Sequence, residues 1–476
     1  MAEPRGVRAV VLAAGAGTRM RSAHPKVLHE VGGRPLIDWA VELACAVTDA
    51  SPVVVVGAGH DAVRDRVAGR AVVAVQPVPD GTGGALAAAR PLLEDARALL
   101  VLPGDVPLLR PDTLRHLLQS FAAAAVDAVL LSARPPDPTG YGRIVRTGGG
   151  FRAIVEERDL SAAEAGLREV NTGVYVFRPA PLWPALAQLA TDNAQGERYL
   201  TDVLAQLPTV AVESLEDWEE MLGVNDRVQL AAVAAALRRR ALRAAMLAGV
   251  TVEDPETTYL EPQVTIGVDS ILRPGTILRG ATHLGRDCIV GPYAELVDTI
   301  VGDGCHIDRA QLVGCRLEGG VRIGPFNRVR PGSELATGSR LGAFTEVARS
   351  RVGPGSAVPH LTYLGDAVLG RDVNIGAGTI TANWDGTTKH PTVIEDGARI
   401  GSHTVLVAPA QVGAGAYTGA GSVVTQPVPA GALGVARARQ RNLLGWVARR
   451  GRVPAGENGA VGRRPPASQG PAEESR

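Results

Sequence analysis

The chain has 476 residues, with 49 basic and 49 acidic side chains, and aromatic residues make up only 4% of it. Its length exceeds that of one ordinary core, so two or three domains are expected. The balanced charge, without a basic patch interleaved with aromatic residues, argues against nucleic acid as a partner.

The cysteines and the N-terminus indicate the cellular setting. Cys45, Cys288, Cys305 and Cys315 lie far apart and form no C-x-x-C pair, which predicts neither a zinc site nor a disulfide framework. The N-terminus lacks the pattern of a signal peptide, and no apolar stretch reaches the roughly 18 residues that a membrane span needs. We therefore expect a soluble, cytoplasmic protein without a membrane partner.

Residues 1–224 have the pattern of an α/β domain. Apolar runs such as "RAVVLAAG", "PVVVVGAG" and "ALLVLPGD" alternate with helix-like segments such as "RPLIDWAVELACAV". Continuous apolar runs are typical of parallel strands buried on both faces, and the segments between them predict crossover helices. The expectation is a Rossmann-like domain.

The first strand runs into a glycine-rich, basic loop, "LAAGAGTRMRSAHPK". Gly15 and Gly17 allow the backbone to approach an anion closely, and Arg19, Arg21 and Lys26 can neutralise phosphate charge. A dinucleotide fingerprint is not met, because the third glycine of G-x-G-x-x-G is missing. On glycines and charges alone, a plain strand-to-helix turn fits as well as a nucleotide phosphate site.

A single long helix is predicted next, in a linker arm over residues 225–249. The segment "DRVQLAAVAAALRRRALRAAMLA" is rich in Ala, Leu and Arg, and Asn225 and Asp226 are suited to cap its first turn.

Residues 250–437 carry a short repeat. An aliphatic residue followed by glycine recurs thirteen times between Ile266-Gly267 and Val412-Gly413, with many gaps of six or multiples of six. A period of six predicts the stacked coils of a parallel β-helix, in which the aliphatic residue fills the axis and glycine relieves the corner. The alternative is an irregular glycine-rich region. Residues 438–476 have no apolar periodicity in their final part, which predicts a C-terminal arm and a disordered tail.

Several longer motifs carry a resemblance to a known family. They are "LAAGAGTRM" with "PKVLH", "GTGGA", "PGDVPLL", "PTGYGRIV", "IVEERD", "VNTGVYVF", "NAQGERYLTD", "GVNDRVQL" and "PHLTYLGDA". Together the chain resembles the bifunctional N-acetylglucosamine-1-phosphate uridylyltransferases and glucosamine-1-phosphate N-acetyltransferases. The resemblance covers residues 7 to 445 and implies that the β-helix is left-handed.

The resemblance implies that the α/β domain transfers a uridylyl group from UTP to N-acetylglucosamine 1-phosphate. Asp105 follows "VLPG" at a strand end, where α/β folds place their ligands, and its oxygen suits Mg²⁺. Asp105 and Asn225 match the metal ligands of the family. The residues that match nucleotide and sugar positions are Leu12, Ala13, Ala14, Gly15, Arg19, Lys26, Gln76, Gly81, Thr82, Gly104, Asp105, Gly142, Glu156, Asn171 and Asn225.

For the β-helix the resemblance implies acetyl transfer from acetyl-CoA to glucosamine 1-phosphate, with His360 as general base and Glu346 orienting it. A lone histidine is usually structural, but the pKa range of imidazole suits this role. Positions matching the acetyl acceptor are Arg330, Glu346, Tyr363 and Asn374; those matching acetyl-CoA are Ala377, Asn383, Trp384, Ser402, Ala420 and Arg437.

Three positions depart from the family pattern. Relatives often carry Lys at Ala16, Tyr at Trp384 and Lys at Ala348. The last change matters most, because that Lys contacts the acetyl acceptor. Arg349 is adjacent, but successive residues of a strand face opposite sides, so it is not expected to substitute.

The family resemblance also implies a homotrimer, with acetyl-transfer sites between neighbouring subunits. The leading hypothesis is one enzyme for two consecutive steps to UDP-N-acetylglucosamine, a cell-wall precursor in bacteria. Two alternatives remain: a single-activity nucleotidyltransferase whose β-helix only assembles or regulates it, and a non-enzymatic trimeric scaffold.

Overall fold

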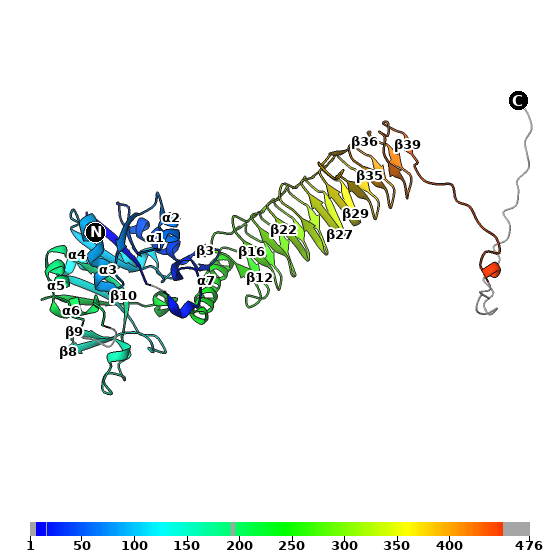
Figure 1. Ribbon diagram of the computed structural model, residues 1–476. Coiled ribbons are helices and arrows are strands. Elements are labelled where there is room, and N and C mark those ends of the chain that lie inside the picture. The colour runs from blue at the N-terminus through cyan, green and yellow to red at the C-terminus, as the bar shows by residue number, and fades with distance from the viewer. Residues whose placement is uncertain (1–5, 16, 192–195, 451–476) are drawn as a thin grey trace, which may run out of the picture.

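The computed structural model describes residues 6–15, 17–191 and 196–450. It has an α/β unit at one end and a straight rod leading away from it, with a long helix at the junction (Figure 1). The family departure at Ala16 and all but the first two residues of the predicted disordered tail, which begins at Arg449, lie outside the described residues. None of the helices in the described ranges combines the length and apolar character needed to cross a membrane.

The α/β unit is built on one mixed sheet in the order β11-β7-β10-β6-β1-β4-β5. Its strands are β1 (Val7–Ala13), β4 (Val53–Gly57), β5 (Val72–Gln76), β6 (Ala98–Pro103), β7 (Ala128–Ala133), β10 (Val170–Phe177) and β11 (Val210–Ser214), with a side ribbon of β8 (Arg143–Thr147) and β9 (Gly150–Val155) and a hairpin of β2 (Glu30–Val31) and β3 (Arg34–Pro35). Strand β1 pairs in parallel with both β4 and β6, and β10 runs antiparallel between β6 and β7. The predicted Rossmann-like arrangement is confirmed, with β10 as an antiparallel insertion.

Helices cover this sheet, and the apolar runs of its strands form the core between them. They are α1 (Leu36–Val47), α2 (Asp61–Val67), α3 (Thr82–Ala89), α4 (Pro111–Ala124), α5 (Pro179–Ala187) and α6 (Thr201–Gln206). The side chains of Val53 to Val56 in β4 are fully buried. Burial on both faces explains why this strand reads as an unbroken apolar run.

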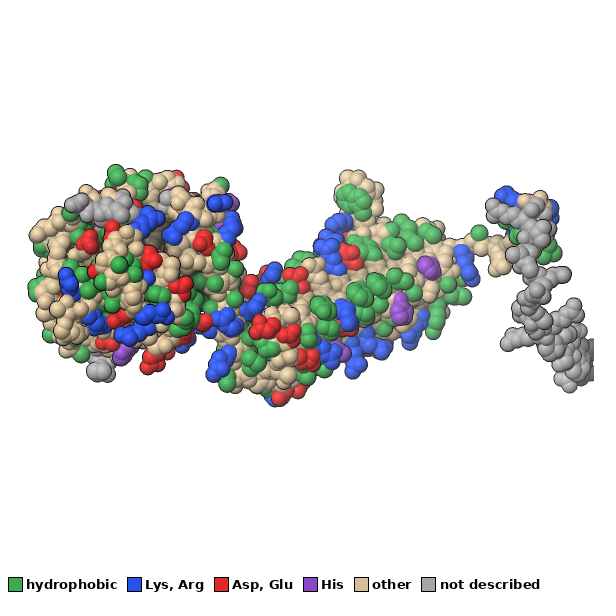
Figure 2. All heavy atoms as spheres, turned by 90° about the horizontal axis from the view of Figure 1, so that it is seen from below, with side chains coloured by type: hydrophobic (Ala, Val, Ile, Leu, Met, Phe, Trp, Pro, Cys, Tyr) green, Lys and Arg blue, Asp and Glu red, His purple; other side chains and the backbone are tan. Residues whose placement is uncertain are grey.

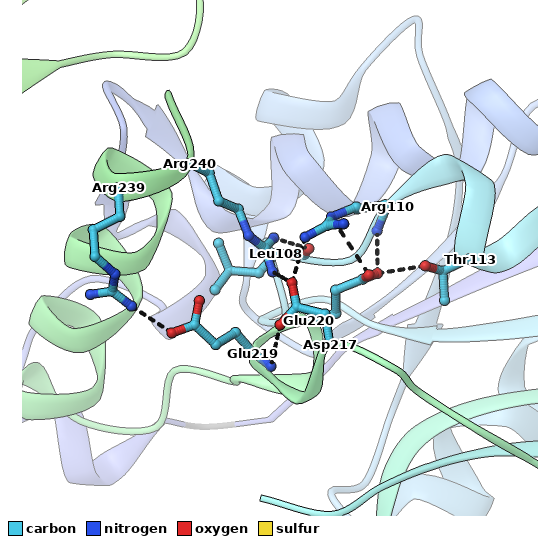
Figure 3. A network of polar contacts seen from close by, with 8 residues as sticks. All are labelled: Leu108, Arg110, Thr113, Asp217, Glu219, Glu220, Arg239 and Arg240. Atoms are coloured by element: carbon cyan, nitrogen blue, oxygen red, sulfur yellow. Dashed lines mark hydrogen bonds and ion pairs between the residues drawn. The ribbon is translucent and has the colours of Figure 1, made fainter. Parts of the chain in front are cut away.

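The predicted arm is α7 (Arg227–Leu247), and Asp226 caps it by accepting a hydrogen bond from the backbone N–H of Gln229 at 2.8 Å. Arg240 of α7 donates to the carbonyl oxygen of Leu108 at 2.6 Å and to Asp217 at 3.0 Å (Figure 3). Leu108 lies three residues after Asp105. The arm is therefore tied directly to the loop that follows β6.

The rod is a parallel β-helix, as predicted. One continuous sheet contains β12 (Thr251–Val252), β13 (Tyr259–Leu260), β15 (Ile271–Leu272), β16 (Ile277–Arg279), β18 (Ile289–Val290), β19 (Glu295–Val297), β21 (His306–Ile307), β22 (Ala310–Val313), β24 (Arg322–Ile323), β25 (Asn327–Val329), β27 (Arg340–Ala348), β29 (Ala357–Gly365), β31 (Asn374–Ile375), β32 (Ile380–Ala382), β34 (Arg399–Ile400), β35 (Val405–Val407), β37 (Tyr417–Thr418), β38 (Val423–Val424) and β39 (Leu433–Gly434). The third face consists of β14 (Thr265–Ile266), β17 (His283–Leu284), β20 (Ile300–Val301), β23 (Arg316–Leu317), β26 (Glu334–Leu335), β28 (Arg351–Val352), β30 (Ala367–Leu369), β33 (Thr392–Ile394) and β36 (Ala410–Val412).

The repeat works as the sequence predicts, with one exception. Eleven of the thirteen aliphatic residues before glycine are buried in the axis, and Ile266 packs against it. Val313 is the exception, because Leu312 fills the axis in that coil. The glycines are needed because neighbouring coils approach closely: a Cβ on Gly353 would lie 2.1 Å from the carbonyl oxygen of Gly370.

Candidate functional site

A cavity of about 430 Å³ opens at the carboxyl ends of β1, β5 and β6. This edge is where open α/β sheets bind ligands, because the loops that follow the strands converge there. Eleven of the predicted nucleotide and sugar residues line it: Leu12, Ala13, Ala14, Gly15, Lys26, Gln76, Gly81, Thr82, Asp105, Glu156 and Asn171.

The remaining four predicted residues lie at its margins. The backbone N–H of Gly104 donates to the carbonyl oxygen of Leu12 at 2.9 Å, and the carbonyl oxygen of Gly142 accepts from the N–H of Asn171 at 2.9 Å. Arg19 and Asn225 are joined by a hydrogen bond of 3.0 Å between Nη2 and Oδ1.

Positive and negative groups meet at one point of the cavity. The ammonium of Lys26 forms an ion pair with Asp105 and donates to Asn225 Oδ1 at 3.2 Å. Gly17 permits this approach, since its φ is 62° and a Cβ there would lie 2.6 Å from the Cβ of Lys26. The loop therefore places the Lys26 ammonium against both a carboxylate oxygen and an amide oxygen.

At the end of β5, Gln76 is held in a fixed orientation. Its Nε2 donates to Asp80 Oδ1 at 2.8 Å and to the carbonyl oxygen of Gly81 at 3.0 Å, and Asp80 is ion-paired with Arg198. Burial would raise the pKa of Asp80, but the hydrogen bonds from Arg198 and Gln76 outweigh it and lower that pKa. The anchored Gln76 amide can distinguish between ligands whose hydrogen-bonding edges differ, because a mismatched ligand would leave buried polar groups of the site unpaired.

The opposite wall carries a carboxyl group and an amide. Glu156 accepts from Thr201 Oγ1 at 3.2 Å, and Asn171 Nδ2 donates to the hydroxyl of Tyr175 at 2.7 Å. Burial raises the pKa of Glu156, and the nearby Asp202 carboxylate adds to this. Burial also raises the pKa of the Tyr175 hydroxyl.

Sequence reasoning missed some of these groups. Asp80, Tyr175 and Thr201 each form a hydrogen bond with a predicted residue, and Arg198 is ion-paired with Asp80, but none of the four was predicted. A signal was present for three of them: Tyr175 lies within "VNTGVYVF", and Arg198 and Thr201 lie within "NAQGERYLTD".

On the rod, the predicted acetyl-transfer residues fall into two groups. His360 and Asn374 line a groove of about 460 Å³ together with Arg322 and Arg340. In β27 and β29, the backbone of His360 pairs with Ala343, before the exposed corner that Leu361 occupies.

The second group lies beyond that corner. Arg330 Nη1 donates to Glu346 Oε1 at 3.2 Å, and the backbone of Glu346 pairs with that of Tyr363. The predicted orientation of His360 by Glu346 stays a prediction, since Glu346 is engaged by Arg330 on this face. In one chain the corner therefore separates Arg330, Glu346 and Tyr363 from His360.

The predicted acetyl-CoA residues continue along the rod. Ala377, Ser402 and Ala420 occupy equivalent positions in successive coils, where the N–H of His403 donates to Ala377 at 2.7 Å and that of Gly421 to Ser402 at 2.8 Å. Asn383 is buried and donates to Asp366, Trp384 is 56% exposed, and Arg437 is exposed beyond the last coil.

At Ala348, where relatives carry Lys, the structure shows why the neighbouring Arg349 does not take over the role of that Lys. Ala348 is fully buried at the end of β27, and Arg349 follows it at a φ of 47°, outside the strand. Arg349 donates to both carboxylate oxygens of Asp366, at 2.7 and 2.9 Å. Its charge is therefore already neutralised, which agrees with the expectation that it does not substitute.

Comparisons with known proteins match both parts of the chain. The MobA-like NTP transferase domain family matches residues 9–210, and the bacterial transferase hexapeptide family (six repeats) matches residues 391–426. "Bifunctional protein GlmU" of Brevibacillus brevis is 45% identical over 447 residues, covering 92% of this chain and 97% of that protein. The proteins of the same name from Heliobacterium modesticaldum and Kineococcus radiotolerans are 46% and 45% identical, over 92% and 94% of this chain and 97% and 93% of their own lengths.

Proposed function

The chain belongs to the family of bifunctional GlmU proteins, and from this premise we propose two consecutive reactions for its two catalytic regions. The β-helix transfers an acetyl group from acetyl-CoA to glucosamine 1-phosphate. The α/β unit then transfers a uridylyl group from UTP to N-acetylglucosamine 1-phosphate and releases pyrophosphate. The proposed domain limits are 1–224, 225–249, 250–437 and 438–476.

The main support for uridylyl transfer is that the predicted residues converge on one cavity at the strand ends. A phosphate oxygen of the sugar attacks the α-phosphorus of UTP, and the bond from that phosphorus to the bridging oxygen of the departing pyrophosphate breaks. Such a transfer depends mainly on positioning and charge neutralisation. Arg19 and Lys26 neutralise the triphosphate, while Gln76, Gly81 and Thr82 face the uracil.

The sugar binds at the wall formed by Gly142, Glu156 and Asn171. Asn171 and Glu156 are held by Tyr175 and Thr201, so their polar groups are fixed before the ligand arrives. Preformed hydrogen-bonding groups favour the acetamido-bearing sugar over one without that group.

The donors around Lys26 fit a magnesium ion. Asp105 and Asn225 offer a carboxylate and an amide oxygen that already share one cation, and Mg²⁺ prefers oxygen ligands while keeping sites for water and phosphate. When bound, Mg²⁺ supplies further neutralisation of phosphate charge.

For acetyl transfer, His360 takes a proton from the sugar amine as that nitrogen attacks the thioester carbon. The carbon–nitrogen bond forms, the carbon–sulfur bond breaks, and the proton passes to the departing thiolate of coenzyme A. Asn374 lies in the same groove and contacts the sugar. The coenzyme lies along Ala377, Ser402 and Ala420, with Asn383, Trp384 and Arg437 near it.

A homotrimer would complete this site. Arg330 and Tyr363 lie across a corner from His360 in one chain, and a neighbouring copy could bring the two groups together. The corner itself is apolar and exposed: the rings of Phe326 and Phe344 stack with centroids 5.2 Å apart, each 56% exposed. Since UTP and acetyl-CoA are cytoplasmic substrates, we place both proposed activities in the cytoplasm. In a bacterium the product would serve cell-wall synthesis.

The buried Ala348 favours one alternative, a single-activity nucleotidyltransferase with an assembly-only β-helix. Two assays on the full chain decide between them. Pyrophosphate release from UTP and N-acetylglucosamine 1-phosphate, abolished by chelating magnesium, tests the first activity. Free-thiol release from acetyl-CoA and glucosamine 1-phosphate tests the second, and its absence would leave the alternative.

A further inference from the structure

The groove beside His360 carries a column of basic side chains that the reactions above do not use. His306, Arg322 and Arg340 stack in register on β21, β24 and β27, and all three line the groove with His360 and Asn374. Basic side chains gather along one edge of the rod in Figure 2.

Glycine keeps the floor of this groove open. Gly324 and Gly342 follow the arginines by two residues and therefore project from the same side of the strand. A Cβ on Gly342 would lie 1.8 Å from the carbonyl oxygen of Pro359, and one on Gly324 would lie 2.5 Å from that of Asp308. The floor is thus backbone, with room for a small ligand beside the two guanidinium groups.

The positive charge in the groove is not neutralised. Other arginines of the rod have acidic partners, as Arg330 does in Glu346 and Arg349 in Asp366. Throughout the described ranges, by contrast, neither Arg322 nor Arg340 forms an ion pair or a side-chain hydrogen bond.

One carboxylate and one imidazole complete the lining. The carboxylate of Asp308 is occupied by Arg309, at 3.0 Å, so it does not cancel the charge of the column. His306 Nε2 has no hydrogen-bond partner in the described part of the chain, so the ring has bonding capacity left. The groove as a whole is cationic.

We propose that this groove is a phosphate-binding site, in which Arg322 and Arg340 hold a phosphate group of one of the two substrates of acetyl transfer. The inference deepens the proposed function and rests on it for the choice of ligands. Arginine suits this task, because its planar guanidinium can make paired hydrogen bonds to phosphate oxygens. Both glucosamine 1-phosphate and coenzyme A carry such a phosphate, and the experiment below distinguishes them by using each as a separate probe.

The test is equilibrium binding to the full chain by calorimetry, with glucosamine 1-phosphate and coenzyme A as separate probes. We expect Arg322→Ala and Arg340→Ala to weaken one probe by about 10- to 150-fold, since each removes hydrogen bonds to a charged group. The probe that weakens identifies the source of the phosphate. Arg340→Lys keeps the charge but loses the paired geometry, so it should weaken that probe less than Arg340→Ala.

Arg351→Ala is the matched control, because Arg351 is an exposed arginine on β28 of the third face. It should bind both probes as the wild type does. The proposal is overturned if the groove variants bind both probes as tightly as this control, or if the wild type binds neither probe. A wild type that binds a probe but releases no thiol would refute acetyl transfer while leaving the groove intact.

Discussion

Among the single residues of the α/β unit, the contact of Lys26 with Asp105 and Asn225 organises the cavity. The side chains of Lys26 and Asp105 are only 14% and 18% exposed, so their charges act on each other and on any ligand with little screening. The Lys26 ammonium lies between the oxygens of Asp105 and Asn225. A triphosphate can therefore take the ammonium as its partner while a second cation takes the two oxygens.

We expect Asp105→Ala to lower pyrophosphate release by about 10²- to 10³-fold or more, because the carboxylate is a proposed metal ligand. Asp105→Asn keeps the shape without the charge and should lose nearly as much. Thiol release should stay at the wild-type level in both variants. Asp61→Ala, an exposed carboxylate of α2, is the control; equal loss of both activities in the Asp105 variants would refute the assignment.

His360 offers the matching substitution in the second reaction. His360→Ala removes the proposed proton acceptor of the attacking amine, so it should slow thiol release by about 10²- to 10⁴-fold and spare pyrophosphate release. His283→Ala, on the third face of the rod, should change neither. A loss much smaller than tenfold, measured with saturating substrates, would remove His360 from the role of base.

Glu156 makes the stability of the α/β unit depend on pH. Burial raises the folded-state pKa of Glu156 above that of the unfolded chain, so its stabilising effect is complete below the unfolded pKa and is lost as pH rises through the raised pKa. Glu156→Gln keeps an acceptor for Thr201 but cannot ionise. Between about pH 4 and pH 8, the Tm of Glu156→Gln should rise relative to the Tm of the wild type as pH increases. Parallel dependence of the two Tm values on pH would contradict this.

At the scale of elements, Glu220 fastens the turn before α7 to the start of α4. This carboxylate is buried and accepts from the backbone N–H of Arg110 at 3.0 Å and from Thr113 Oγ1 at 2.7 Å (Figure 3). It thereby satisfies two donors at the start of the helix, one from the backbone of its N-cap residue and one from a side-chain hydroxyl of its first turn. The same turn leads into Asn225, so this network also fixes where the arm begins.

Glu220→Ala should lower the free energy of unfolding of the α/β unit by about 1.5 to 3 kcal/mol, because it removes the hydrogen bonds that a buried carboxylate accepts. The adjacent Glu219 makes a surface pair with Arg239, so Glu219→Ala should cost about 0 to 1 kcal/mol. Urea unfolding followed by circular dichroism measures both. If the two variants unfold alike, Glu220 does not fasten the helix as described.

At the scale of the whole molecule, the rod presents an apolar corner that one chain leaves open. Tyr293, Phe326, Phe344 and Leu361 are between 56% and 70% exposed there. An exposed strip of large apolar side chains indicates an interaction surface. The proposed trimer would cover it and would unite Arg330 with His360 of a neighbouring copy.

Phe344→Glu should therefore reduce the solution mass from three chains to fewer, because it places a charge in an apolar contact. Thiol release should fall with the loss of assembly, and pyrophosphate release should persist. Phe344→Leu keeps the contact apolar and should remain assembled. Sedimentation analysis gives the mass; a wild type that sediments as one chain would refute the trimer.

The architecture was predictable from the amino-acid sequence, because local periodicity reflects burial. Unbroken apolar runs mark strands covered on both faces, and the six-residue repeat marks coils that share an axis. The helical arm and its Asp226 cap were also predictable, since capping depends on neighbouring residues alone. Motifs identified the residues that line the cavity as well, from Leu12 to Asn171.

The contacts between side chains of distant segments emerged from the three-dimensional structure alone. The contacts of Lys26 with Asp105, of Asp80 with Arg198 and of Glu220 with Arg110 join positions about 80 to 120 residues apart, and no periodicity encodes them. The corner that separates Arg330 from His360 depends on where β27 and β29 bend. Contacts of this kind follow from three-dimensional packing, which is why the charges and partners of the sites could not be read from spacing.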